Sequence, residues 1–222
     1  NMMIMVIYAL ITIAIFGMWY YARYEGNFLP SPKKTFNPMM LVAIVILVPG
    51  TQFAANFIAN LTGYIRPDWM QQYNELFETS GITDTTFVTV LYSVILAPIC
   101  EELIFRGVTM RCARKALPFA LANLMQAALF GLFHLNWIQG IYAFALGIVL
   151  GYVCERGGSI YYSMGLHLLF NLWGTLSGFF PDPGNSVVVF VIVIAVTIVS
   201  LVVGFVLFNK GRRKLPINST GI

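Results

Sequence analysis

Long apolar runs constrain the fold of this 222-residue chain more than any other feature. Hydrophobic residues make up 59% of it and charged residues only 10%, whereas a soluble domain is about one quarter charged. A helix needs about 20 mostly apolar residues to cross a bilayer. We therefore expect an all-α integral membrane protein, a polytopic helical bundle with one domain over residues 1–222. About seven hydrophobic segments are expected, at 2–21, 38–65, 85–106, 118–135, 138–154, 159–179 and 187–208; the fourth and fifth are short for a full crossing.

Lysine and arginine residues predict how the chain is oriented. The loops at 22–37, 106–117 and 155–158 and the tail at 209–222 hold all of them except Arg66. Because short cytoplasmic loops are enriched in Lys and Arg, we expect these loops and the C-terminus in the cytoplasm and the N-terminus outside. The basic residues form no continuous stripe, so the expected partner is the lipid bilayer and not nucleic acid.

The longest outer loop predicts one further helix. Its apolar side chains recur at helical spacing, so we expect a short amphipathic helix that lies on the outer surface of the membrane. The residues on its apolar face are Trp69, Met70, Tyr73, Leu76 and Phe77.

Charged residues inside the expected spans are the second constraint. Residues 97–107 read APICEELIFRG, and both histidines of the chain, His134 and His167, also lie in apolar segments. A charge at the bilayer centre costs about 2.5–3.5 kcal/mol on insertion scales, so such residues usually line an internal cavity and have a function.

The expected depths of these residues in the bilayer indicate that their side chains can come together. Glu101 and His134 each lie about 16 residues from the turn near 117–118, which is about 24 Å along a helix. His167 lies about 12 Å into its own segment, and Asn171 is one turn deeper. We therefore expect Glu101, His134, His167 and Asn171 to converge in the cytoplasmic half of the bilayer.

Helical spacing suggests a role for each residue. Glu102 and Arg106 are four residues apart and can form an ion pair, whereas Glu101 points about 100° away and is free to act as a base. His167 and Asn171 present two hydrogen-bond donors on one face, which suits a developing oxyanion. The ring of Phe130 shares a face with His134 and can wall the pocket.

In order along the chain, these residues form the motifs Glu-Glu-x-x-x-Arg, Phe-x-x-x-His and His-x-x-x-Asn over residues 101–171. The pattern resembles the CPBP family of CAAX proteases and bacteriocin-processing enzymes, also called Abi. The resemblance implies an intramembrane endopeptidase with a cytosol-facing cavity and a motif-bearing core at 85–179. It also implies that Glu101 and His134 activate water and that His167 and Asn171 stabilise the oxyanion. Glu102, Arg106 and Phe130 would support them, without a required cofactor.

Other mechanisms and classes stay open at this point. Glu101, His134 and His167 form a His₂Glu set that suits catalytic zinc. A buried Glu/His cluster also occurs in transporters, and some relatives are linked to bacteriocin immunity without proteolysis. The expected substrate is a membrane-associated peptide or protein, prenylated or not, and the expected location is a bacterial cell membrane.

Overall fold

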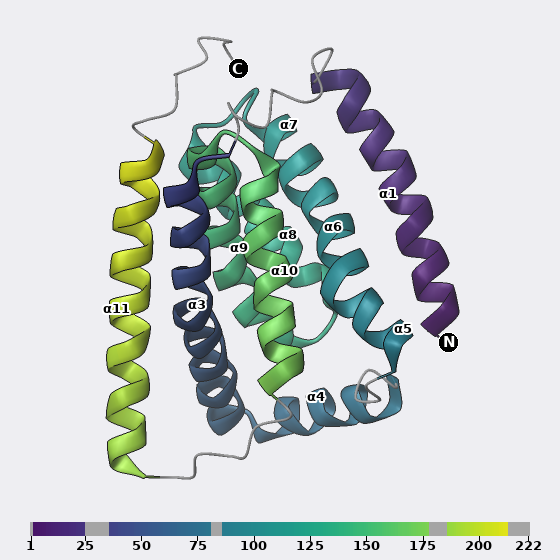
Figure 1. Ribbon diagram of the computed structural model, residues 1–222. Helices are drawn as coiled ribbons and strands as arrows, with labels where there is room; N and C mark the ends of the chain where they lie inside the picture. The colour runs from purple at the N-terminus through teal and green to yellow at the C-terminus, as the bar shows by residue number, and fades with distance from the viewer. Residues whose placement is uncertain (1, 25–35, 81–85, 178–185, 213–222) are drawn as a thin grey trace.

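The computed structural model describes residues 2–24, 36–80, 86–177 and 186–212 (Figure 1). Every regular element in these ranges is helical, so the predicted all-α fold is confirmed. The helices outside the third predicted segment are α1 (Met2–Tyr24), α3 (Pro38–Ile65), α4 (Pro67–Ser80), α8 (Phe119–Phe133), α9 (Trp137–Gly157), α10 (Ile160–Ser177) and α11 (Val187–Arg212).

Five helices of the described part are long and apolar enough to cross a membrane. They correspond to the first, second, third, fifth and seventh predicted segments. The fourth forms the shorter apolar helix α8, as its length suggested, whereas the fifth forms the full-length helix α9. The sixth predicted segment, α10, is not among the five; it carries His167 and Asn171 and lies at the centre of the bundle (Figure 1).

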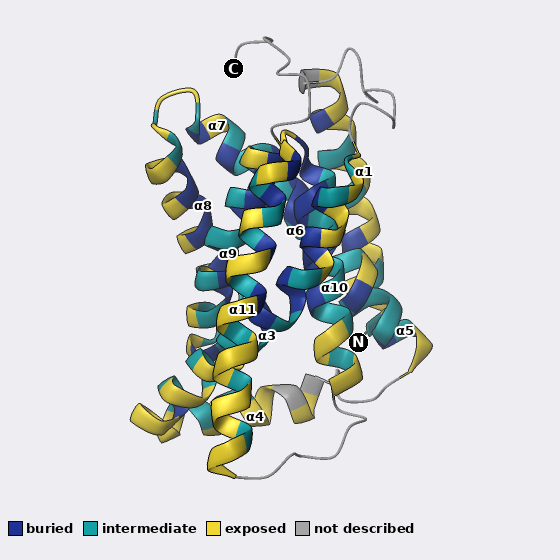
Figure 2. Cartoon of the chain, turned by 60° about the vertical axis from the view of Figure 1, so that its left-hand side comes forward, coloured by how far each residue is buried: buried dark blue, intermediate teal, exposed yellow. Residues whose placement is uncertain are grey.

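The outer helices are covered with aliphatic side chains. In Figure 2, α11 is exposed over most of its surface, while buried residues concentrate on the helices between α11 and α1. Ile4 and Ile11 on α1, and Val191 and Val202 on α11, are more than half exposed. A helix that is apolar on all sides fits a hydrocarbon environment, so these faces are expected to contact lipid.

The third predicted segment differs from its expected form. It runs without a break from Phe87 to Ala113 and therefore continues past Arg106. Its parts are α5 (Phe87–Val90), the π-helical η1 (Leu91–Leu96), α6 (Ala97–Glu102), the π-helical η2 (Leu103–Met110) and α7 (Arg111–Ala113). The predicted boundary at Arg106 was wrong, because this arginine is fully buried in the bundle and is not a loop residue. The basic residues at the end of this helix begin at Arg111, in its last segment α7.

Helix α4 is present where the outer surface helix was predicted, and it lies across one end of the bundle (Figure 1). Trp69 stacks on Trp137 at the start of α9, with 5.3 Å between ring centroids. The guanidinium of Arg66 lies 4.2 Å from the Trp69 ring centroid. The side chain of Phe77 lies outside the described residues. These contacts attach α4 to the end of the bundle opposite the turn between α7 and α8.

Cysteine labelling tests the predicted orientation. Lys115, in the turn after α7, and Asn74, on α4, are both exposed and lie at opposite ends of the bundle. In a variant whose three native cysteines are replaced, a cysteine at Lys115 should react with an impermeant maleimide only from the cytoplasmic side. A cysteine at Asn74 should react only from outside, and the reversed pattern would contradict the orientation.

Candidate active site

A fully buried ion pair lies at the centre of the predicted site. The Nη1 atom of Arg106 is 2.8 Å from Oε1 of Glu102, and neither side chain is exposed. The i,i+4 spacing predicted this pair. Arg106 also donates to the Gly147 carbonyl at 3.2 Å, and its guanidinium carbon lies 4.6 Å from the Phe130 ring centroid. Removing one partner of such a pair would leave an uncompensated charge.

His167 links the two glutamates. Its Nδ1 atom lies 3.0 Å from Oε1 of Glu102, the same oxygen that Arg106 contacts. Its Nε2 atom lies 3.6 Å from Oε2 of Glu101. Because the Arg106-paired carboxylate accepts hydrogen bonds, Nδ1 carries a proton and donates it. The Glu101 side chain is 15% exposed and that of Glu102 is 0% exposed, so Glu101 is the more accessible carboxylate of the two.

His134 ends α8 with a defined tautomer. Its Nδ1 atom lies 2.8 Å from the carbonyl oxygen of Phe130. A carbonyl only accepts hydrogen bonds, so Nδ1 carries the proton and Nε2 keeps a free lone pair in the neutral ring. The imidazole is half-buried and stands edge-on to the Phe130 ring at 4.9 Å between centroids. Such a nitrogen can accept a proton from water.

The side chain of Asn171 donates a hydrogen bond to a backbone carbonyl of η1 that has no helical donor because of Pro98. In η1 the backbone N–H of Ala97 donates to the carbonyl five residues earlier, at Tyr92. The next donor in that pattern would be Pro98, which has no N–H. The carbonyl of Ser93 is therefore available, and Nδ2 of Asn171 donates to it at 2.8 Å. The second amide hydrogen of Asn171 remains for another acceptor.

The structure thus joins six of the seven predicted site residues through a series of contacts, whereas Asn171 contacts the Ser93 carbonyl instead. Glu101, Glu102 and Arg106 come from α6 and η2, Phe130 and His134 from α8, and His167 and Asn171 from α10. The Phe130 ring contacts three of these side chains, those of Arg106, His134 and His167. It stands edge-on to the His167 ring with 5.7 Å between centroids.

A further polar network between α8 and α9 was not predicted from the sequence. Gln126, fully buried on α8, donates to the Gly147 carbonyl at 2.8 Å and to Asn123 at 2.7 Å. A Cβ on Gly151 would collide with Oδ1 of Asn123, so a larger residue there would displace this side chain from the network. Two amides spaced i,i+3 in an apolar segment, Asn123 and Gln126, are the sequence signal for this network.

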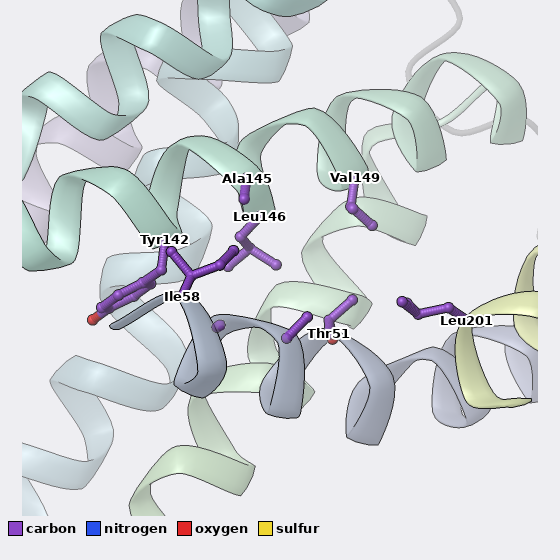
Figure 3. A pocket seen from close by; sticks show the side chains of 9 residues that line it. Thr51, Ile58, Tyr142, Ala145, Leu146, Val149 and Leu201 are labelled. Carbon is purple, nitrogen blue, oxygen red and sulfur yellow. The ribbon is translucent and has the colours of Figure 1, made fainter. Parts of the chain in front are cut away.

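The predicted cytosol-facing cavity stays a prediction. A cavity of about 80 Å³ lies between α3, α9 and α11 (Figure 3). Its lining is almost entirely apolar and includes Thr51, Ile58, Tyr142, Leu146 and Leu201. None of the seven predicted site residues lines it.

The zinc alternative would need Glu101, His134 and His167 around one ion. In the described ranges, no three His, Cys, Asp or Glu side chains are grouped closely enough to hold a metal ion. The Nδ1 atoms of both histidines are engaged by protein oxygens, which leaves one nitrogen of each for any other ligand. Zinc binding stays a prediction of the alternative mechanism.

The fold and these contacts define a polytopic helical membrane protein with buried and partly buried Glu, His and Asn side chains from neighbouring helices. Residues 83–173 match the family described as Type II CAAX prenyl endopeptidase Rce1-like. This match agrees with the resemblance to the CPBP family of CAAX proteases that the three motifs predicted, and it confirms that resemblance for the central segment. The match covers less than half of the chain and includes all seven predicted site residues. No curated protein and no solved structure matches the chain.

Replacing Arg106 tests whether the buried pair supports the fold. Arg106→Ala leaves the Glu102 carboxylate buried and uncompensated, which should cost about 3–5 kcal/mol of folding free energy. We expect a lower yield of folded protein and a lower melting temperature in detergent. Arg114→Ala is the matched control, because Arg114 pairs with Glu155 at 3.1 Å where both side chains are partly exposed. That change should cost about 1 kcal/mol or less. Equal melting temperatures for the two variants would contradict a structural role for Arg106.

Proposed function

We propose that this protein is an intramembrane endopeptidase that hydrolyses a peptide bond in a membrane-associated peptide or protein. Water activated by Glu101 and His134 would be the nucleophile. The observation that carries the proposal is the contact of Glu101 with His167, inside a segment that matches a family of endopeptidases. The partial exposure of Glu101 and His134, beside fully buried Glu102 and Arg106, supports this division between reacting and supporting residues.

The first step is the addition of water to the scissile carbonyl. The water gives a proton to Glu101 or to the free Nε2 of His134 while its oxygen bonds to the carbonyl carbon. The carbonyl electron pair moves to oxygen and makes a tetrahedral oxyanion. With both ring nitrogens protonated, His167 donates through Nδ1 to Glu102 and through Nε2 to the oxyanion. The second amide hydrogen of Asn171 is the other donor.

The second step breaks the peptide bond. The oxyanion reforms the carbonyl, the carbon–nitrogen bond cleaves, and the leaving amine takes the proton held by the base. Glu102 and Arg106 act through His167: the carboxylate accepts from Nδ1, and the arginine fixes that carboxylate. This resembles the way a buried acid orients the histidine of a serine protease.

Substitution of the two proposed bases tests this function. Glu101→Gln and His134→Ala should each lower the cleavage of a membrane-anchored peptide library in liposomes by at least the 10²–10⁴-fold that general-base catalysis contributes. Both variants should still fold and insert, because neither residue belongs to the buried ion pair. Glu155→Gln, which changes a carboxylate paired with Arg114 away from the site, is the control and should stay near wild type. Activity of either test variant within fivefold of wild type would refute the assignment.

Asn171→Ala tests oxyanion stabilisation. Loss of one oxyanion donor lowers kcat by about 10²–10³-fold, and KM should change little because the interaction strengthens only as the oxyanion forms. Asn209→Ala is the matched control: its amide also donates to a helix carbonyl, that of Phe205, but on α11. A raised KM with unchanged kcat for Asn171→Ala would mean that Asn171 binds substrate in the ground state.

A further inference from the structure

Gln52 is a buried polar residue in the middle of α3 that none of the motifs includes. It is 7% exposed, and its Nε2 atom donates to Oδ1 of Asn56 at 3.3 Å. No donor among the described residues reaches its Oε1 atom. The other buried side-chain atoms without a partner, on Glu102, Arg106 and Gln126, all belong to the network around the ion pair. Gln52 is therefore a separate acceptor that burial has left unsatisfied, and such a group is costly to keep.

Gln52 lies next to α10, the helix that carries His167 and Asn171. A Cβ on Gly174 of α10 would lie 3.9 Å from Nε2 of Gln52. The neighbouring pair, Phe53 and Trp173, is in edge-to-face contact with 6.1 Å between centroids. His167, Asn171 and Gly174 follow one another at i, i+4 and i+7, so they share one face of α10. Gln52 thus lies at the end of the row that carries both proposed oxyanion donors.

The distance along this row matches a short length of peptide. Asn171 and Gly174 are about 4.5 Å apart along the helix, and His167 and Gly174 about 10 Å. An extended peptide rises about 3.3 Å per residue, so Gln52 is within about three residues of a scissile carbonyl held by His167 and Asn171. Gly174 is itself exposed and has no side chain to cover this face.

We infer that Gln52 binds the substrate main chain, with Oε1 accepting a hydrogen bond from a peptide N–H within about three residues of the scissile bond. The inference rests on the proposed peptidase function. A peptide must be extended to be cleaved, and its N–H groups then lose their helical partners at a depth where no water replaces them. Gln52 offers a neutral acceptor at that depth. Its neighbours Phe53 and Trp173 are aromatic, which favours an uncharged donor over an ammonium group.

The thermal stability of a Gln52 variant provides the first test of this inference. Gln52→Leu removes an unsatisfied buried acceptor, so the variant should melt at or above the temperature of wild type while it binds substrate less well. Thr51→Val is the matched control, because the Thr51 hydroxyl donates within its own helix to the carbonyls of Leu47 and Val48, both at 2.9 Å. Its kcat and KM should stay within twofold of wild type.

The decisive experiment is a double-mutant cycle with backbone-methylated substrates. The probe is a quenched fluorescent peptide ending in a farnesylated CAAX box, and the same peptide with an acyl anchor is run in parallel. Single peptide nitrogens on either side of the scissile bond are N-methylated in turn. At one position, methylation should raise KM for wild type and Thr51→Val about three- to tenfold, the value of one hydrogen bond. For Gln52→Leu, whose KM is already raised, methylation at that position should change KM less than twofold.

The outcomes separate this inference from the proposed function. Binding of the same peptides to Glu101→Gln, measured by fluorescence anisotropy, supplies a readout that does not need catalysis. In that background the added Gln52→Leu change should weaken binding by the same factor. If wild type cleaves the peptide and every methylated position affects Gln52→Leu as it affects wild type, the Gln52 inference is wrong and the proposed function stands. If wild type cleaves none of these peptides, the proposed function fails, and a Gln52-dependent loss of peptide binding would still identify the contact.

Discussion

The buried carboxylate of Glu102 is the interaction on which the rest of the site depends. One oxygen of this group contacts both Arg106 and His167. A fully buried charge pair is stable only when both partners are present, because either one alone would be an uncompensated buried charge. The contact of this oxygen with His167 therefore connects α6 to α10 and keeps a proton on Nδ1 of His167. The proposed bases, Glu101 and His134, are more exposed than this buried pair.

Departures from regular helix supply the remaining contacts. Two π-helical segments flank Ala97–Glu102, and such segments are frequent at functional sites. The missing N–H of Pro98 leaves the Ser93 carbonyl to Asn171. Glycine acts similarly between helices, since a Cβ on Gly131 would lie 2.5 Å from the Gly140 carbonyl oxygen. That close approach of α8 and α9 fixes the turn that carries His134.

Contacts within one helix could be predicted from the sequence, whereas contacts between helices could not. The spacing of Glu102 and Arg106, and of Phe130 and His134, predicted both contacts because helix geometry fixes side chains four residues apart. The link from His167 to Glu102 depends on how α10 is rotated against α6, which no spacing along the chain specifies. The charge count placed Arg106 in a loop because it uses only the positions of basic residues and takes no account of the ion pair with Glu102. Gln52 was missed although Gln52, Asn56 and Asn60 are spaced four residues apart in this segment, because none of these neutral amides belongs to a motif.

We propose that protein side chains, and not a metal ion, activate the water. Elemental analysis of protein purified without chelators, combined with an activity assay after prolonged chelation, tests it most directly. The account predicts far less than one zinc per chain and unchanged cleavage after chelation. One zinc per chain, lost together with activity on chelation and restored with it when zinc is added, would contradict the account. Glu101, His134 and His167 would then be metal ligands.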